Sequence, residues 1–266
     1  MKQVTSRDNA DYRLLQRVLA GRRAPGERSG DSRRIALEGV HLCQSWLEFK
    51  GQPELAFFDG ERLSHPEIAG LLRAVGDARV RICSSTLLRG VSQVVQGQGV
   101  IFIASAPQPE VPLRLRNNCL WLDRIQDPGN MGTLLRTAAA AGMREIFAST
   151  ACVAAWSGKV LRSAQGAHFV LDIHEGQDLN ALTQRLDIPL LATALEAAHP
   201  LYDTELPESA AWVFGNEGQG VAPALLARAD LRLFIPHDAA VESLNVAVAA
   251  GICLFEQRRK AGGPRS

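Results

Sequence analysis

Short apolar runs alternate with amphipathic segments along the first hundred residues. Amphipathic or apolar-periodic segments predict helices at 11–19, 40–49 and 66–75. Runs of branched and aromatic residues predict strands at 34–37, 55–58, 80–83 and 100–104. This switching between the helical and the extended period predicts a small α/β domain at the start of the chain.

The second half shows the same alternation more clearly. Its predicted strands are 119–122, 145–148, 169–173, 190–194, 212–214 and 231–235. Its predicted helices are 131–141, a segment near Lys159, 223–229 and 244–257. Strands that alternate with helices predict a mostly parallel sheet covered on both faces, with ligands at the carboxyl ends of the strands.

A proline-rich segment separates the two halves. Residues 106–112 contain three prolines, which fix φ and remove backbone donors, so neither helix nor central strand is expected there. We therefore predict two domains, at 1–106 and 117–260.

Composition excludes several classes of protein. The 266 residues are 46% hydrophobic and 21% charged, as in ordinary globular proteins. No apolar run approaches the ~18 residues of a membrane span, and the first residues lack the apolar core of a secretory signal. A cytoplasmic location is therefore expected. Five scattered cysteines without a Cys-x-x-Cys pair, and six histidines without ligand spacing, predict no metal site.

The charge distribution is uneven although the net charge is only +1. Residues 1–40 hold nine basic against five acidic side chains, and all but one of the basic residues are arginine. Such a cluster can be a solvated helix face or a surface that attracts phosphates. The preference for arginine favours phosphate, because guanidinium pairs with it bidentately.

Three loops that follow predicted strands carry the candidate chemistry. The first, 127–132, leads into a helix, with Asn130 as a candidate N-cap. Arg136 lies one to two turns into that helix, which is otherwise rich in Leu and Ala, and it needs an anionic partner from the protein or from a substrate phosphate. The alternative is simply a helix start.

The second loop, 214–221, contains three glycines, which permit positive φ and close backbone approach to a ligand. It is no dinucleotide fingerprint, because a third correctly spaced glycine is missing, and Gly158-Lys159 is followed by Val160, so no Walker A loop is present. The alternative is a glycine-rich turn with an N-capping Asn.

The third loop, 242–245, runs into a helix of small apolar residues. Ser243 is the expected N-cap. Asn245 stands where an apolar run begins, and a buried amide without partners costs about 1–3 kcal/mol, so a polar group must meet it. The alternative is a capped core helix with one satisfied Asn.

Taken together, these loops resemble the motifs of the SpoU (TrmH-type) family of RNA 2′-O-ribose methyltransferases, within the SPOUT class. The matching segments are 122–138, 213–218 and 235–246, and the resemblance covers essentially all of 117–258. The first half is similar to the family's accessory domain, a small α/β RNA-binding module, through 37–39 and 98–100.

The resemblance implies a deep trefoil knot in the C-terminal domain and S-adenosylmethionine as the methyl donor. It implies that the cofactor is held by seven residues: Thr193, Leu195, Gly215, Asn216, Gly218, Ile235 and Leu244. Arg136 is the family's candidate for activating the ribose 2′-hydroxyl, and Asn130, Glu217, Ser243 and Asn245 would order the ribose and orient Arg136. Because arginine is effectively never deprotonated, holding a phosphate and stabilising an alkoxide is the easier role.

The resemblance also implies a homodimer with the site near the interface, and ribosomal RNA as a more frequent target than transfer RNA. Six basic residues are the candidate RNA contacts: Arg22, Arg23, Arg33, Arg34, Lys159 and Arg162. Two other possibilities are a silent RNA-binding protein of the same fold and a base methyltransferase of the wider class. His237 departs from the family pattern, either as a loop variation or as a proton acceptor.

Overall fold

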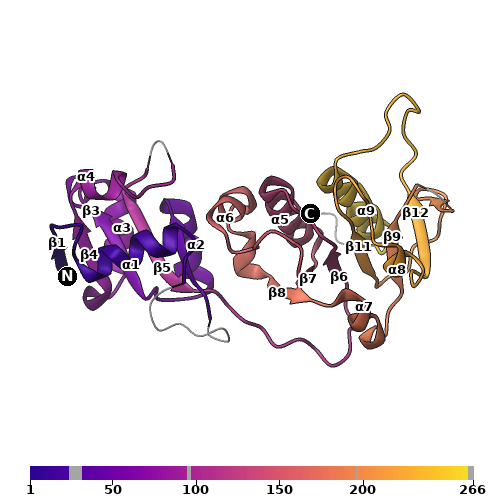
Figure 1. Cartoon of the computed structure of the whole chain (residues 1–266), viewed down its shortest axis with the longest axis horizontal. Helices are drawn as coiled ribbons and strands as arrows, with labels where there is room; N and C mark the ends of the chain where they lie inside the picture. The colour runs from indigo at the N-terminus through magenta and orange to yellow at the C-terminus, as the bar shows by residue number, and fades with distance from the viewer. Residues whose placement is uncertain (24–31, 95–96, 196, 263–266) are drawn as a thin grey trace. The chain divides into compact units, whose positions relative to one another are not determined.

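The computed structural model describes residues 1–23, 32–94, 97–195 and 197–262 (Figure 1). The chain divides into two compact units, one of residues 1–107 and 156–169, the other of 108–155 and 170–266. The division falls within the proline-rich segment. Residues 156–169 group with the N-terminal unit, although the sequence assigns them to the C-terminal half.

The N-terminal unit is a mixed five-stranded sheet in the order β1-β4-β3-β5-β2. Its strands are β1 (Lys2–Val4), β2 (Arg34–Glu38), β3 (Leu55–Asp59), β4 (Val80–Cys83) and β5 (Val100–Ser105). Its helices are α1 (Ala10–Leu19), α2 (Val40–Phe49), α3 (Pro66–Ala74), α4 (Ser85–Arg89) and α6 (Gly158–Ala164). Strand β5 runs antiparallel to both β3 and β2, so the carboxyl ends of β2, β3 and β4 share an edge with the start of β5.

Alternation along the strands sends side chains to two cores in this unit. Helix α1 lies across the strands (Figure 1), and its Tyr12, Leu15 and Val18 pack with Phe57 and Ile101. Helices α2 and α3 pack against each other. The unit is thus the α/β arrangement of strands and helices that the period switching predicts.

The C-terminal unit is a seven-stranded sheet in the order β10-β12-β9-β11-β6-β7-β8, and every pair is parallel. Its strands are β6 (Cys119–Leu122), β7 (Glu145–Ser149), β8 (Asp172–Gln177), β9 (Leu190–Thr193), β10 (His199–Pro200), β11 (Ala211–Phe214) and β12 (Leu231–Phe234). Its helices are α5 (Pro128–Ala141), α7 (Leu179–Leu182), α8 (Pro223–Leu226) and α9 (Val246–Lys260). The predicted α/β parallel-sheet fold is confirmed.

Both faces of this sheet are buried, as the continuous apolar strands require. Trp121 and Val213 face the core beneath α7 and α8. On the opposite face α9 covers Trp212, whose indole Nε1 donates to Gln257 Oε1 at 2.7 Å. Gln257 is only 3% exposed, and its amide nitrogen donates to the Pro207 carbonyl at 3.0 Å. This buried network fixes the last helix on the sheet.

One predicted strand and two predicted caps are wrong. The segment predicted as strand 169–173 begins as a 3-10 turn, and β8 starts only at Asp172, because the Phe169 ring packs edge-on against Trp46 at 5.5 Å. Asp127 caps α5, and its carboxylate accepts from the Asn130 backbone N–H at 2.8 Å. Asn245, rather than Ser243, caps α9.

Candidate active site

The carboxyl ends of β6, β9, β11 and β12 meet at one edge of the C-terminal sheet, where a cavity of about 690 Å³ opens. That volume lies within the roughly 300–1,000 Å³ of small-molecule sites. All seven predicted cofactor residues line it: Thr193, Leu195, Gly215, Asn216, Gly218, Ile235 and Leu244. Three of the five predicted catalytic residues, Glu217, Ser243 and Asn245, line it as well.

The glycine-rich loop forms one wall of this cavity and closes on itself. Asn216 and Gly220 form an isolated antiparallel bridge. A Cβ at Gly215 would lie 2.1 Å from the Gly220 carbonyl carbon and 2.2 Å from the Val221 nitrogen, so only glycine fits there. The Asn216 side chain accepts from the Gly218 and Gln219 amides at 3.0 Å. The loop is therefore shaped by its own backbone, which stays close to any ligand in the cavity.

Asp123 and Arg124, at the end of β6, fasten the same loop. The Arg124 guanidinium donates to Gln219 Oε1 at 2.7 Å and to the Gly220 carbonyl at 3.1 Å. It also pairs with Asp123, which is 4% exposed and accepts from the Ala222 amide at 2.8 Å. Arg124 holds a left-handed conformation, φ +59°, which is uncommon for a non-glycine residue.

The sequence alone did not predict that Asp123 and Arg124 bind the glycine-rich loop, although Asp123 lies inside the segment that carries the family resemblance. The signal was a charged pair directly after an apolar strand, where a buried carboxylate needs donors. Asn216 forms a further hydrogen bond between the glycine-rich loop and the end of β6, because its Nδ2 donates to the Arg124 carbonyl at 3.0 Å.

Three residues from three segments far apart in the sequence form a row of hydrogen bonds beside the cavity: Asn130 in the first turn of α5, Glu217 in the glycine-rich loop and Asn245 at the start of α9. Asn245 Nδ2 donates to Asn130 Oδ1 at 2.9 Å. Asn130 Nδ2 in turn donates to Glu217 Oε1 at 3.0 Å. Asn245 also caps α9, since its Oδ1 accepts from the amides of Ala247 and Val248. The polar partner that Asn245 requires is therefore Asn130.

The environment of Glu217 keeps its carboxylate ionised. Partial burial raises the pKa of Glu217, but hydrogen bonds from the Asn130 side chain and from nearby backbone amides outweigh burial, so the net pKa is lowered. The site thus contains a fixed negative charge that faces the cavity and is oriented by Asn130.

Arg136 lies apart from the cavity. It is exposed on α5 and forms no hydrogen bond or ion pair with any part of the chain that the structure describes. The anionic partner that the sequence calls for is therefore not supplied by these residues. Ser243 is exposed and precedes the α9 cap. His237 is exposed at the rim, where its Nδ1 lies 2.7 Å from the Ile235 carbonyl oxygen.

The predicted RNA contacts fall in the N-terminal unit. Arg22, Arg23 and Lys159 are exposed. Arg34 instead pairs with Glu54 at 2.6 Å, so its charge is already compensated.

Two further predicted contacts bond to neighbouring residues. Arg33 donates to the Gly21 carbonyl at 3.0 Å, and Arg162 donates to the Gln93 side chain at 3.4 Å. Arg28, another arginine of the basic segment 1–40, lies outside the described residues.

Neither a metal cluster nor a membrane helix is found among the described residues. No three His, Cys, Asp or Glu side chains there are grouped to hold a metal ion. No helix in the same part of the chain is long and apolar enough to cross a membrane.

Comparison with known proteins places these features in a family. The model of the SpoU rRNA Methylase family matches residues 117–255. The 23S rRNA (guanosine(2553)-2'-O)-methyltransferase RlmP of Bacillus subtilis is 33% identical over 226 residues, which cover 84% of this chain and 87% of that protein.

Solved structures agree over nearly the whole chain. An RNA 2'-O ribose methyltransferase is 26% identical with a TM-score of 0.77, covering 97% of this chain and 98% of that chain. An AdoMet-bound rRNA methyltransferase from Sinorhizobium meliloti shares the fold at 24% identity, with a TM-score of 0.81 and 97% of each chain covered.

Proposed function

Because the chain belongs to the SpoU rRNA Methylase family, we propose that it transfers a methyl group to a ribose 2′-hydroxyl of ribosomal RNA. The observation that carries this proposal is the hydrogen-bonded chain Asn245–Asn130–Glu217, which joins the three motif loops beside one cavity. The similar Bacillus subtilis protein is named for a 23S rRNA 2'-O-methylation, which favours ribosomal over transfer RNA.

The cavity fits S-adenosylmethionine as the cofactor. When bound, the cofactor supplies an activated methyl group on a sulfonium. The volume of the cavity and its backbone-lined wall at Gly215 suit a ligand that is held mainly by backbone groups. Leu195, Ile235 and Leu244 would hold the apolar parts of the cofactor, and Thr193, Asn216 and Gly218 would complete the wall. Asp123 and Arg124 would keep this wall closed.

The chain's own residues would then align the ribose and accept the proton of its 2′-hydroxyl. Glu217, ionised and oriented by Asn130, offers an acceptor toward the cavity. Ser243 and Asn245 line the same side. Holding the hydroxyl in one orientation is a large part of catalysis for an in-line displacement. Arg136, with its guanidinium exposed, is available for the RNA phosphate and for stabilising negative charge on the 2′-oxygen.

A homodimer through the C-terminal unit would bring Arg136 near a cavity. Helix α9 exposes Val248 (53%) and Phe255 (46%), which are seven residues apart and therefore on one face. Helix α5, which carries Arg136, packs against α9. We propose that this face is the dimer interface and that Arg136 serves the partner's site. The mass of the particle in solution, measured by light scattering, tests the dimer.

The N-terminal unit would bind the RNA by phosphate contact and shape, using Arg22, Arg23, Arg33, Lys159 and Arg162. We also propose a cytoplasmic location, because the similar rRNA methyltransferases include bacterial proteins such as RlmP of Bacillus subtilis. The trefoil knot remains a prediction from the family resemblance.

The experiment is methyl transfer from radiolabelled S-adenosylmethionine to ribosomal RNA, followed by alkaline hydrolysis. Methylation of the 2′-oxygen blocks cleavage of the next bond, so label should appear in alkali-resistant dinucleotides. Label in mononucleotides would indicate base methylation, and RNA binding without transfer would indicate a silent RNA-binding protein. Either result overturns the proposal.

A further inference from the structure

The cavity of the C-terminal unit is lined by one guanidinium that the proposed methyl transfer does not use. Arg232 is the single charged residue of β12, whose other residues are apolar. Its backbone pairs with Ala192 of β9, which belongs to the core beneath α7 and α8, so the Arg232 side chain leaves the sheet on that face. Both Arg232 and Leu226 of α8 line the cavity. A charged side chain within an apolar strand requires a polar or ionic partner.

Arg232 is anchored, but its charge is not compensated by the described part of the chain. It is half-buried, and its Nε donates to the Leu226 carbonyl oxygen at 3.0 Å. Within residues 1–23, 32–94, 97–195 and 197–262, no carboxylate forms an ion pair with Arg232, and its terminal nitrogens donate no hydrogen bond. Four of the five N–H groups of a guanidinium therefore remain for a ligand. Their planar arrangement matches the two oxygens of a carboxylate.

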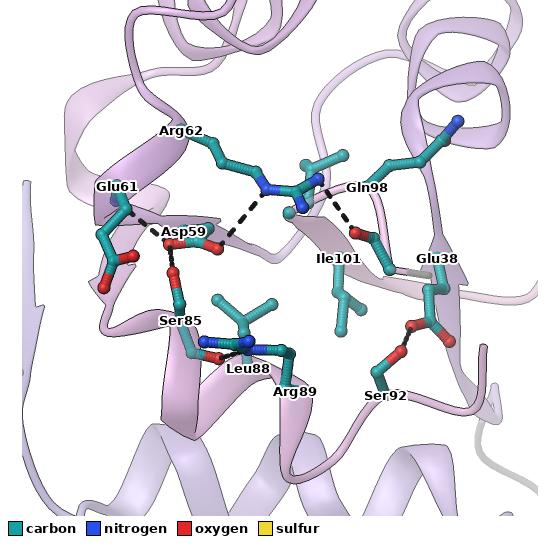
Figure 2. Close-up of a pocket in the computed structure, with 13 residues that line it drawn as sticks. Glu38, Asp59, Glu61, Arg62, Ser85, Leu88, Arg89, Ser92, Gln98 and Ile101 are labelled. Atoms are coloured by element: carbon teal, nitrogen blue, oxygen red, sulfur yellow. Dashed lines mark hydrogen bonds and ion pairs between the residues drawn. The ribbon is translucent and has the colours of Figure 1, made fainter. Parts of the chain in front are cut away.

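The arginines of a second cavity, of about 270 Å³ in the N-terminal unit, are in a different situation (Figure 2). Arg62 lies 3.9 Å from the Asp59 carboxylate and donates to the Gly97 carbonyl at 3.1 Å. Asp59 also accepts from Ser85 Oγ at 2.6 Å. The charges in Figure 2 are thus compensated within the unit, whereas the charge of Arg232 is open to a ligand.

The charged groups around the C-terminal cavity complement those of S-adenosylmethionine. Among the described residues that line it, Arg232 is the one guanidinium or ammonium group, and Glu217 and Glu242 supply the carboxylates. Arg232 lies on β12, whereas Glu217 follows β11, two strands away in the sheet. S-adenosylmethionine carries one carboxylate and two positive groups, the sulfonium and the α-ammonium. One guanidinium and two carboxylates therefore match the cofactor charge for charge.

We propose that Arg232 binds the α-carboxylate of S-adenosylmethionine and so selects a methyl donor with an intact amino-acid end. Charge-assisted bonds between a guanidinium and a carboxylate are among the strongest hydrogen bonds in proteins. The contact would hold the amino-acid end of the cofactor on the α8 side of the cavity. This inference rests on the proposed function, but it assigns the contact to a residue outside the motif segments 122–138, 213–218 and 235–246.

The test is isothermal titration calorimetry of the full chain with two ligands, S-adenosylmethionine and decarboxylated S-adenosylmethionine, which lacks only the carboxylate. The native chain should bind the complete cofactor about tenfold more tightly, near the low end for a hydrogen bond between charged groups. Arg232→Gln should reduce this ratio to below about twofold, because it removes the charge and the paired donors. Arg232→Lys should retain part of the preference, since it keeps the charge without the planar fork.

Arg228→Gln is the matched control. Arg228 is exposed, precedes Arg232 by four residues and does not line the cavity, so the ratio should keep its native value. Thermal melting establishes that each variant is folded. Equal affinity of the native chain for the two ligands, an unchanged ratio in Arg232→Gln, or the same loss in Arg228→Gln would overturn the inference. Weaker RNA binding by Arg232→Gln with an unchanged ratio would overturn it too, and would indicate a phosphate contact.

This inference and the proposed function can fail separately. A carboxylate preference that depends on Arg232, in a chain that transfers no methyl group to ribosomal RNA, would support the inference while the proposed function fails. Methyl transfer to the ribose by a chain whose ligand ratio does not depend on Arg232 would support the function and overturn the inference.

Discussion

Asn130→Asp tests the hydrogen-bonded chain at the centre of the site. The substitution puts an oxygen where Asn130 Nδ2 donates to Glu217 Oε1 at 3.0 Å. Two carboxylates at that distance repel by about 1.4 kcal/mol in water. The lost hydrogen bond to a charged group adds at least about 1.5 kcal/mol. Together these give about 3 kcal/mol, or roughly a 150-fold loss of kcat/KM if the alignment of Glu217 is needed in the transition state.

Asn130→Ala is the matched comparison, because it removes the bond without adding charge, and should lose only about tenfold. At pH 8 the Asp variant should therefore be about tenfold slower than the Ala variant. Repulsion of about 1.4 kcal/mol raises the pKa of the new pair by about one unit, so protonation should narrow this ratio as the pH falls toward 5.5.

In the native protein the pKa of Glu217 is lowered, so Glu217 stays ionised over that range. The stabilisation that its hydrogen bonds provide is present above the unfolded pKa, about 4.3, and is lost as the pH falls through the lower folded pKa. The assay measures methyl transfer by both variants at each pH. The ratio of their activities cancels any pH effect that the two variants share. Two results would refute the role of the hydrogen bonds that join Asn245, Asn130 and Glu217. One is an Asp variant as active as the Ala variant at pH 8, and the other is a ratio of the two activities that does not change with pH.

Three further substitutions test other parts of the C-terminal unit. Gly215→Ala should abolish S-adenosylmethionine binding in calorimetry, because its Cβ would lie 2.1 Å from the Gly220 backbone; retained affinity would show that the loop opens without loss. Arg136→Ala should reduce methyl transfer strongly while cofactor affinity stays within about twofold, since Arg136 does not line the cavity; near-normal turnover contradicts its role. Gln257→Leu leaves the buried Trp212 indole N–H without an acceptor and should cost about 3 kcal/mol, or roughly 6–12 °C in Tm; an unchanged melting curve would be the contrary result.

Local signals predicted most of the elements. Val40–Phe49, Val80–Cys83 and Cys119–Leu122 have the predicted bounds, because each is a short apolar segment ended by turn residues. The edge strands Lys2–Val4 and His199–Pro200 were missed, since so few residues carry no period.

The errors come from competition between neighbouring side chains. Asp127 and Asn130 are both good caps, and so are Ser243 and Asn245, and the backbone geometry that chooses between them is set by tertiary contacts. The motifs predicted that the loops meet, but no local pattern predicts that Asn130 is the partner of Asn245.

The contacts that build this site join residues very far apart in the chain. Asn130 and Asn245 are separated by 115 positions, Asp123 and Ala222 by 99, and Arg124 and Gly220 by 96. Parallel sheets with such non-local pairings fold slowly, because the chain must lose the entropy of closing long loops before the stabilising contacts form. During refolding, the circular dichroism of the helices should therefore recover before methyl-donor affinity does. A partly folded chain would be helical and yet unable to react.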